Sequence, residues 1–582
     1  MQGVTDASTD RLRIWVLFLL VLLVWQRTPF GEFLTLDDMA LVAALHEMPH
    51  IDIPGFFWGE NVGSLYHRPL VVASYLLEKA FLDIDPLIMR CNNLLLQLAN
   101  TLWIYLIVGQ ICRLRRCEAG WWPWLWALLF ACHPLATESV NWVSGRTDLL
   151  AGFFVLAATW LLLRYRLQPK WPLPPLAAIC AAGAVFSKEV AVAFIPGLFL
   201  LCLARSDDAL APGGLRRGRA ANLAKVLIFV TVALTGILVL RELPIEAGQG
   251  SIGRTLAYIR SDFTYSGMLF FRLFGFYAKK VVAPWPLNLA IGEVDPLYDL
   301  LGVLVVILLV WLFIQNRLSG VFFVIAALLL LPVYPISFGQ IAWMPYAERY
   351  AYLPSAFAVC GLASFGCKGL RSGRFRPGFA VALIIMVASF AVTTYRRNGV
   401  WQSNLTLWPA TLRHNSSSAK VHSAYGEALY LAGDYQAAER EFDLARSVPG
   451  LGYDPQAGID YGVFMAQTWR REEAVAAWRD VLRRTGGKSV RALTELSGYC
   501  SRSPYMLEIC GGYEPVAAEI ESLYDLTSDP AWLVSLGRVA KFAGRDDDAD
   551  DYFRRAYTDL PGGHPLYSQV RETVTRLGRS SQ

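Results

Sequence analysis

Apolar runs follow one another from Ile14 to about Thr394, and this pattern limits the fold more than any other feature. A helix needs about 20 mostly apolar residues to cross a bilayer. The chain is 55% hydrophobic and 17% charged, against roughly 45–50% and about 25% in soluble domains. From Asn415 onward, charged and apolar residues alternate instead. The pattern excludes a simple soluble enzyme and a disordered chain, and it predicts an all-α polytopic membrane domain followed by a soluble domain.

We expect about eleven membrane-spanning helices, several of them short. Their predicted ranges are 12–26, 87–112, 121–136, 148–165, 172–186, 189–204, 222–240, 299–315, 319–336, 353–368 and 377–395. The apolar stretch 256–283 is interrupted by basic residues, which predicts one or two interfacial helices there. The first apolar run lacks a small-x-small cleavage site, so we expect it to be a retained span and not a signal peptide.

Basic residues in short loops predict the orientation, because such loops stay on the cytoplasmic side. Alternate loops carry Arg113, Arg115 and Arg116; Arg164, Arg166 and Lys170; Arg205, Arg216, Arg217 and Arg219; Arg317; and Lys368, Arg371, Arg374 and Arg376. The N-terminus is therefore predicted to be cytoplasmic. The other loops and the C-terminal domain are predicted to face the periplasm or an equivalent lumen. The net charge of +5 reflects this topology and does not indicate a nucleic-acid partner.

The ten cysteines show neither zinc-finger nor redox spacing. Eight lie in or beside apolar segments, where a free cysteine behaves as a small hydrophobic residue. Only Cys500 and Cys510, in a polar stretch, are placed to form a disulfide, and only in an oxidising compartment. Spacing therefore predicts no cysteine metal site and leaves the state of that pair open.

The predicted outer face carries ionisable residues at span ends, which are costly in a membrane unless they pair or face water. The set comprises Asp37 and Asp38; Tyr66, His67 and Arg68; His133 and Glu138; Arg146; Lys188 and Glu189; and Glu348 and Arg349. Singly, each has an ordinary explanation: the Asp pair as a helix N-cap, the cations as interface anchors. A carboxylate pair and four cations from five separate loops together indicate a functional site.

Such a set suits glycosyl transfer at the membrane surface. A carboxylate can take the proton of an attacking hydroxyl as a general base. Cations can hold a lipid-linked phosphate and stabilise it as a leaving group. A transporter fits less well, because its polar residues should lie near the midplane within broken helices.

At these residues the sequence resembles the transmembrane and tetratricopeptide-repeat O-mannosyltransferases and their bacterial relatives, members of the GT-C glycosyltransferase superfamily. The resembling elements, in order, are TLDDMALV, PGFFWGENVGSLYHRPL, HPLATESVNWVSGRTDLLA, FSKEVAV, PWPLNL, AERYAYLPS and TYRRNGVWQSNLTLW. Two departures affect the identity of the sugar and acceptor. Animal members commonly have Tyr-Arg-Pro-Leu where this chain has Tyr66-His67-Arg68-Pro69-Leu70, and their repeat arrays are much longer.

The resemblance implies a GT-C-like membrane domain over 1–400 of a bacterial inner-membrane protein. Its periplasmic loops would be 27–86, with amphipathic helices, and 241–298. It implies sugar transfer from a polyprenyl-phosphate donor, with Asp38 the preferred base and Asp37 orienting it or binding sugar hydroxyls, or the reverse. Donor-phosphate residues are expected at Arg68, Arg146, Lys188 and Arg349. Site-shaping or acceptor-side residues are expected at His133, Glu138, Glu189, Glu348, Tyr66 and His67.

Substrates and cofactors stay open at several points. Mannose is implied by the resemblance alone, and Ser or Thr of exported proteins is the expected acceptor. The alternatives are lipid A or an envelope glycan as acceptor and, in a different class, a non-catalytic scaffold or transporter. Asp37, Asp38 and Glu138 offer oxygen ligands for a divalent ion, yet similarity to protein O-mannosyltransferases favours metal-independent catalysis.

Residues 401–582 show the register of tetratricopeptide repeats, which place small and large residues at set offsets within 34 residues. The matching positions are Gly426, Ala438, Phe442, Ala445 and Pro449; Gly537, Ala549, Phe553, Ala556 and Pro561; and, more weakly, Gly462, Ala474 and Trp478. Residues 487–528 are either a diverged repeat or an insertion. Stacked repeats form a concave surface, predicted to hold the protein acceptor, to dock a partner enzyme or to dimerise.

Overall fold

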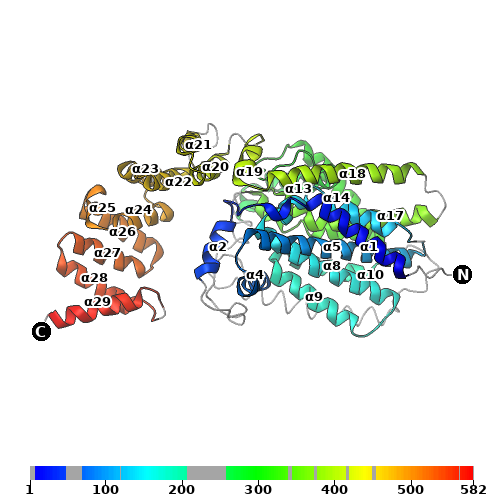
Figure 1. Cartoon of the computed structure of the whole chain (residues 1–582), viewed down its shortest axis with the longest axis horizontal. Coiled ribbons are helices and arrows are strands. Elements are labelled where there is room, and N and C mark those ends of the chain that lie inside the picture. The colour runs from blue at the N-terminus through cyan, green and yellow to red at the C-terminus, as the bar shows by residue number, and fades with distance from the viewer. Residues whose placement is uncertain are drawn as a thin grey trace. The chain divides into compact units, whose positions relative to one another are not determined.

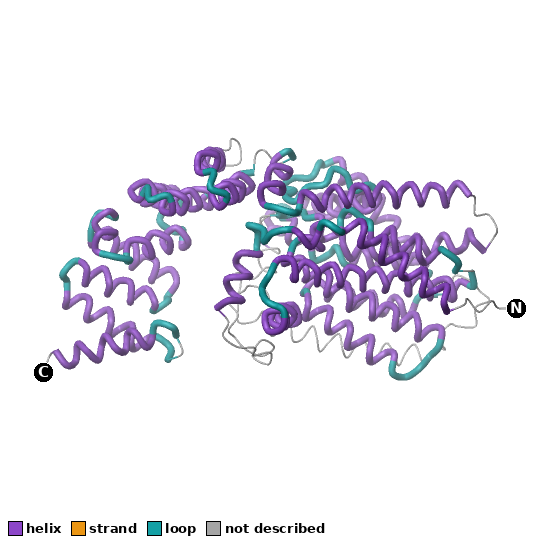
Figure 2. The backbone as a smooth tube through the Cα atoms, in the orientation of Figure 1, coloured by secondary structure: helices purple, strands orange, loops and turns teal. Residues whose placement is uncertain are grey.

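The computed structural model describes most of the chain, and every regular element in the described part is helical (Figure 2). The described residues are 7–47, 68–117, 119–205, 257–338, 344–371, 377–414, 418–447, 454–562 and 564–580. The predicted all-α class is confirmed, with no strand in these ranges. The chain divides into two compact units, Met1–Asn415 and Ser416–Gln582.

Within the described residues of the first unit, six helical segments are long and apolar enough to cross a membrane, as in a multi-pass membrane protein. They correspond, in some cases with ends that differ by several residues, to α1 (Ala7–Trp25), α5 (Pro86–Arg115), α8 (Arg146–Leu167), α14 (Leu297–Gln315), α17 (Tyr352–Arg371) and α18 (Pro377–Val400). Four more predicted spans coincide with shorter apolar helices: α6 (Trp122–Ala131), α9 (Leu173–Ser187), η3 (Glu189–Phe194) with α10 (Ile195–Leu203), and α15 (Leu318–Leu328). The predicted span 222–240 lies outside the described residues, so the total of about eleven stays a prediction.

Helix α5 packs against α6, α8 and α17 within the first unit (Figure 1). Its buried polar groups are hydrogen-bonded to α17. Tyr352 Oη donates to Gln97 Oε1 over 2.6 Å, and Asn100 Nδ2 donates to Tyr352 Oη over 2.9 Å. Hydrogen bonds between helices hold them in register within a membrane. The bundle therefore fixes the helix ends from which the predicted site residues project.

Short helices cover the end of this bundle that is predicted to face outward. They are α2 (Asp38–Glu47), α4 (Pro69–Phe81), α7 (Ala136–Asn141), η2 (Val143–Gly145), η4 (Glu348–Ala351) and α19 (Asn404–Leu412). Arg90, in the first turns of α5, is fully buried and donates to Glu32 O over 2.6 Å and to Trp401 O over 3.1 Å. Arg90 thereby ties the first outer loop to the segment that follows α18.

The apolar stretch 256–283 forms a long helix, α13 (Phe263–Val282), which packs against α14. The two backbones approach so closely that a Cβ atom on Gly275 would lie 2.1 Å from Tyr298 O. Arg272 Nε and Asp299 Oδ1, 2.7 Å apart, pair across the same contact. The basic residue that interrupts the apolar pattern at 272 is thus neutralised between helices. The expectation that this stretch is interfacial stays a prediction.

The second unit consists of helices arranged mostly as consecutive hairpins. Its helices are α20 (Ala419–Leu431), α21 (Tyr435–Ser447), α22 (Pro455–Gln467), α23 (Arg471–Arg484), α24 (Val490–Cys500), α25 (Pro504–Ile509), α26 (Tyr513–Thr527), α27 (Ala531–Phe542), α28 (Asp546–Asp559) and α29 (Tyr567–Ser580). The strongest pairings are α20 with α21, α22 with α23 and α27 with α28. A disulfide between Cys500 and Cys510 joins the ends of α24 and α25.

Three hairpins share one close contact between a glycine and the aromatic residue sixteen positions later. A Cβ atom on the glycine would lie 3.0 Å from Phe442 at Gly426, 2.4 Å from Trp478 at Gly462 and 2.8 Å from Phe553 at Gly537. The glycine leaves room for the ring, so the glycine–aromatic spacing seen in the sequence reflects packing of the ring on the facing helix. Pro449 lies outside the described residues, and the tetratricopeptide identity of the hairpins stays a proposal.

Candidate active site

Asp38 is the first residue of α2 and is fully buried. Its Oδ2 accepts a hydrogen bond from Leu34 N–H over 3.2 Å, and its Oδ1 accepts from Ser144 N–H over 3.2 Å and from Ser144 Oγ–H over 3.1 Å. Burial raises the pKa of Asp38 to about 6, although these hydrogen bonds and Arg90 favour the charged form. One oxygen therefore joins α2 to η2, and the other joins it to the segment that precedes α2.

Asp37 directly precedes α2 and, unlike Asp38, is exposed. Its main-chain carbonyl accepts from Leu41 N–H over 2.9 Å and closes the first helical turn. The surrounding protein raises the pKa of Asp37 by desolvation, and the positive charges of Arg349 and Arg68 act against that rise. Asp37 is thus an accessible carboxylate in the field of two of the predicted cations.

Arg68 lies at the start of α4 and forms a two-point ion pair with Glu189 of η3. The distances are 2.9 Å from Nε to Oε2 and 2.7 Å from Nη2 to Oε1. The Glu189 side chain is 41% exposed.

Lys188, next to Glu189, is buried and pairs with Asp148 of α8, with Nζ 2.6 Å from Oδ1. Its ammonium also lies 5.9 Å from the centre of the Tyr350 ring. Burial lowers the pKa of Lys188, Asp148 opposes this effect, and Arg68 and Arg349 add to it. The charges of Arg68 and Arg349 therefore act on Lys188, and the shared role that the sequence suggested for these cations stays a prediction.

Arg349 pairs with the fully buried carboxylate of Glu138 in α7. Glu138 Oε2 also accepts from the main-chain N–H of Arg349 over 2.9 Å, so one carboxylate fixes both the backbone and the side chain. The guanidinium carbon lies 5.1 Å from the Trp142 ring centre and 4.9 Å from that of Tyr350. Glu138 therefore orients the cation of Arg349, a pairing that the sequence did not predict.

Arg146 differs from Arg68, Lys188 and Arg349 because protein groups on several elements surround its guanidinium. It is 1% exposed and its Nη1 lies 2.6 Å from Oε1 of Glu78 in α4. It also donates from Nε to Asn93 Oδ1 over 3.0 Å and from Nη2 to Met89 O over 2.9 Å. These contacts join α4, α5 and α8, and they suit Arg146 to positioning these elements.

His133 is 2% exposed and acts in the packing at the end of α6. Its Nδ1 accepts from Leu135 N–H over 3.3 Å, which leaves Nε2–H to donate to Val281 O over 2.9 Å. Its ring centre lies 4.7 Å from that of Phe390. Tyr66 and His67 lie outside the described residues.

Sequence reasoning missed two cations that converge on Glu348. Lys280 Nζ lies 3.1 Å from Glu348 Oε1, which also accepts from Asn288 N–H over 2.8 Å, and Arg397 Nη2 lies 3.9 Å from Oε2. Among the described residues, Arg397 Nε and Nη2 and Glu348 Oε2 are buried without a hydrogen-bond partner. A basic residue inside the apolar stretch 256–283 and the Arg-Arg pair of TYRRNGVW were the available signals.

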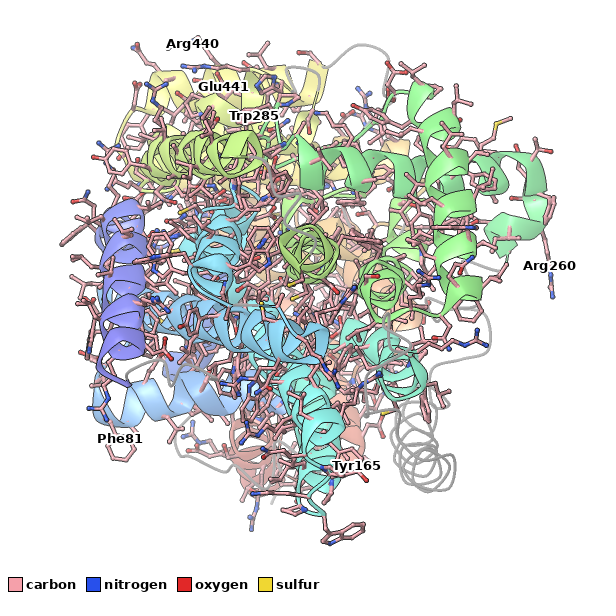
Figure 3. The ribbon with its side chains drawn as sticks, turned by 90° about the vertical axis from the view of Figure 1, so that its right-hand side faces the viewer. Phe81, Tyr165, Arg260, Trp285, Arg440 and Glu441 are labelled. Carbon is pink, nitrogen blue, oxygen red and sulfur yellow. A yellow bond between two sulfur atoms is a disulfide. The ribbon has the colours of Figure 1, made fainter. Side chains whose placement is uncertain are left out.

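The PWPLNL element forms the loop that covers these cations. Figure 3 shows Trp285 of this loop beside α18, where its ring centre lies 5.8 Å from that of Phe390. Asn288 of the same loop contacts Glu348 through its main-chain N–H. The sequence singled out this element by resemblance only, and its position next to Glu348 is given by the structure.

Comparison with curated proteins gives three similar chains. The chain is 23% identical over 429 residues to the human protein O-mannosyl-transferase TMTC3, covering 67% of this chain and 46% of that protein. It is 26% identical over 409 residues to the protein O-mannosyl-transferase F38B6.6 of Caenorhabditis elegans, covering 66% of this chain and 55% of that protein. It is 24% identical over 492 residues to the protein O-mannosyl-transferase Tmtc3 of Drosophila melanogaster, covering 71% of this chain and 52% of that protein.

The chain is a relative of the TMTC protein O-mannosyl-transferases. The similarity expected from the ordered motifs is thereby confirmed. No protein-family model matches the chain. The chain spans about half the length of these TMTC relatives.

Proposed function

We propose that the chain is a GT-C-type membrane glycosyltransferase that moves a sugar from a polyprenyl-phosphate donor to Ser or Thr hydroxyls of exported proteins. The observation that carries the proposal is the exposed Asp37 in the field of Arg68 and Arg349, within the unit that contains the candidate membrane spans. The relatives' name, protein O-mannosyl-transferase, supports the reaction class and mannose as the sugar. In this proposal the protein lies in a bacterial inner membrane, with the site facing the periplasm.

Asp37 is the proposed general base. Its carboxylate takes the proton of the acceptor hydroxyl while the hydroxyl oxygen bonds to the anomeric carbon of the sugar. The bond from that carbon to the lipid phosphate oxygen breaks, and the phosphate leaves with the bonding electrons. Attack from the face opposite the leaving group inverts the anomeric centre.

Asp38 is assigned a positioning role in place of the base role that the sequence favoured. A base needs an oxygen within reach of the substrate proton. Asp38 is 0% exposed and both of its oxygens accept hydrogen bonds from the protein, whereas the neighbouring carboxylate of Asp37 is exposed. Asp38 fixes α2, and therefore Asp37, against Ser144.

Arg68 is the proposed contact for the donor phosphate. A guanidinium matches two phosphate oxygens as it matches two carboxylate oxygens, and Arg68 already holds Glu189 in this manner. Because Glu189 is 41% exposed, a phosphate can replace it without leaving Arg68 unpaired. Lys188 and Arg349, held by Asp148 and Glu138, add positive charge that stabilises the leaving group.

The second unit is proposed to hold the protein acceptor as a tetratricopeptide-type array. Between α21, α22 and α23 it contains a pocket of about 390 Å³. The pocket is lined by Asp443, Arg446, Ser447, Gly458, Ala477, Asp480 and Arg484. Charges of both signs beside small residues suit an extended polypeptide with polar side chains.

The test is transfer by the purified full-length protein in lipid nanodiscs. Tritiated polyprenyl-phosphate mannose and exported proteins from a strain lacking the gene are supplied, and labelled residues are identified by mass spectrometry. We expect label on Ser or Thr side chains. Label on lipid A or an envelope glycan would correct the acceptor, and absence of transfer to any acceptor by folded protein would support a scaffold or transporter.

A further inference from the structure

Three cysteines that are scattered in the sequence meet at one end of the helical bundle. Cys112 lies in the last turn of α5, Cys117 follows that helix and Cys367 lies near the end of α17. Their sulfur atoms all lie within 4.8 Å of one another, and those of Cys112 and Cys367 are 3.5 Å apart. Among the described residues this is the one such cluster of possible metal ligands.

The end of α5 explains how Cys117 returns to Cys112. Arg116 has a left-handed backbone with φ of 52°, and its N–H donates to Arg113 O over 3.2 Å. The N–H of Cys117 then donates to Cys112 O over 3.0 Å. These two bonds define a Schellman motif, in which the side chain after the left-handed residue contacts the one five positions earlier. Here both side chains are thiols.

Helix packing brings the third thiol into place. Arg115 of α5 is buried and its Nη2 donates to Ser364 Oγ over 3.0 Å, one turn before Cys367 on α17. Trp122 Nε1 donates to Ala363 O over 3.1 Å on the same stretch of helix. The register of α17 against α5 is therefore set by two directional bonds about one turn before Cys367.

The spacing of the three sulfurs suits a shared metal ion. With metal–sulfur bonds of about 2.3 Å, sulfur ligands lie about 3.8–4.0 Å apart in tetrahedral or trigonal sites. A disulfide would use two sulfurs at about 2.05 Å and leave the third without a role. Thiolates select soft ions such as Zn²⁺ and Cu⁺ over Mg²⁺ or Ca²⁺.

We propose that Cys112, Cys117 and Cys367 form a thiolate site for a soft d10 metal ion, Zn²⁺ or Cu⁺, that clamps α5 to α17. Binding releases the three thiol protons as three metal–sulfur bonds form. Cys112 and Cys367 are buried and Cys117 is half-buried, so an ion enters from the side of Cys117, where water can complete a Zn²⁺ site. The positive charge of Arg115 offsets the excess negative charge of the thiolates.

This site is separate from the proposed transferase site. Arg90 lies at the outer end of α5, and Cys112 lies about 33 Å further along the helix at a rise of 1.5 Å per residue. In the predicted topology the cluster is at the cytoplasmic end, where thiols remain reduced. The clamp thus acts on the bundle, and its presence does not depend on the sugar-transfer reaction.

Metal content of the purified full-length protein is the first test. Wild type and Cys117→Ser are titrated with Zn²⁺ and, under reducing anaerobic conditions, with Cu⁺, each against a chromogenic chelator. Cys180→Ser, another half-buried free cysteine, is the matched control. We expect about one ion per wild-type or control chain. The Cys117 variant should bind about 100-fold more weakly or worse, since even outer-shell changes cost about 10- to 100-fold.

Alkylation of the wild-type protein gives a readout that needs no variant. We expect Zn²⁺ or Cu⁺ to protect Cys117 from N-ethylmaleimide, as measured by mass spectrometry, while labelling of Cys180 is unchanged. The two ions are compared at equal free concentration, and the one that protects Cys117 better is identified as the preferred metal. Equal affinity in wild type and Cys117→Ser, unprotected Cys117, or a Cys112–Cys367 disulfide in the reduced preparation would overturn the proposal.

Discussion

At the residue scale, Asp37 and Asp38 are neighbours in sequence and lie in opposite environments. Asp38 is buried as α2 begins and accepts three hydrogen bonds, whereas Asp37 is exposed and lies in the field of Arg68 and Arg349. The sequence predicted the pair as a unit. It did not distinguish the two, because the direction of each side chain depends on where α2 starts and on contact with Ser144, 106 residues away.

The raised pKa of Asp38 predicts a pH dependence of stability. The pKa of Asp38 rises from 3.8 to about 6 on burial, so the folded protein holds this proton more tightly than the unfolded chain does. The stabilisation is complete below about pH 4 and is lost as pH rises through about 6, amounting to about 3 kcal/mol. Thermal unfolding of wild type and Asp38→Asn should show this slope in the wild type only. Parallel curves for the two proteins would contradict the burial of Asp38.

Arg146 carries a prediction about buried charge. In Arg146→Met, Glu78 stays buried without its cationic partner, and we expect the free energy of unfolding to fall by about 3–5 kcal/mol. The double variant Arg146→Met/Glu78→Gln removes both charges and should recover part of that loss. Tryptophan fluorescence during denaturation in detergent measures both. A double variant no more stable than the single one would show that the pair is not coupled.

At the element scale, apolar runs predicted the helices of the membrane unit. The observed helix lengths also depend on prolines and on ion pairs between distant residues, which hydropathy does not capture. The predicted span 121–136 ends as a helix at Ala131, and Pro134 precedes the short helix α7. α7 is buried although it contains Thr137 and Glu138. The partner that permits this, Arg349, lies 211 residues away, beyond any local sequence pattern.

Glycine-to-alanine substitutions at two positions in the second unit should have opposite effects on the free energy of unfolding. In Gly462→Ala the new Cβ would lie 2.4 Å from Trp478 Nε1, so we expect a loss of about 1–3 kcal/mol from overpacking. In Gly498→Ala no described atom lies within 4 Å of the new Cβ. Helix propensity then favours alanine by about 1 kcal/mol.

Chemical denaturation of the full chain compares the two glycine variants, following far-UV circular dichroism of the second unit's transition. Gly498→Ala serves as the matched control for the backbone effect of replacing a helical glycine. A Gly462→Ala variant as stable as Gly498→Ala would contradict the close packing of the ring on the glycine.

At the scale of the whole molecule, thiol chemistry differs between the two units. The three clustered thiols lie at the end of the bundle predicted to be cytoplasmic, and the Cys500–Cys510 disulfide lies in the second unit, predicted to be periplasmic. Reducing and oxidising compartments favour these two states, respectively. The cysteine positions alone did not predict the cluster, because a helix cap and a helix–helix contact create it.

The topology predicts which cysteine substitutions react from outside. Asp83→Cys lies in the predicted outer loop and Lys170→Cys in a predicted cytoplasmic loop, and both positions are exposed. A membrane-impermeant maleimide applied to spheroplasts should label the first and label the second only after permeabilisation. Labelling of Lys170→Cys in intact spheroplasts would reverse the orientation and place the proposed site on the cytoplasmic side.

The central claim is that Asp37 is the base of a sugar transfer, and the most direct measurement is the transfer rate of Asp37→Asn from polyprenyl-phosphate mannose. Asp83→Asn is the control, an exposed carboxylate in the same outer loop. We expect Asp37→Asn to lose about 10²- to 10⁴-fold in rate, the usual contribution of a general base, with its unfolding temperature unchanged. The control should retain wild-type activity. A folded Asp37→Asn protein that transfers mannose at the wild-type rate would contradict the account.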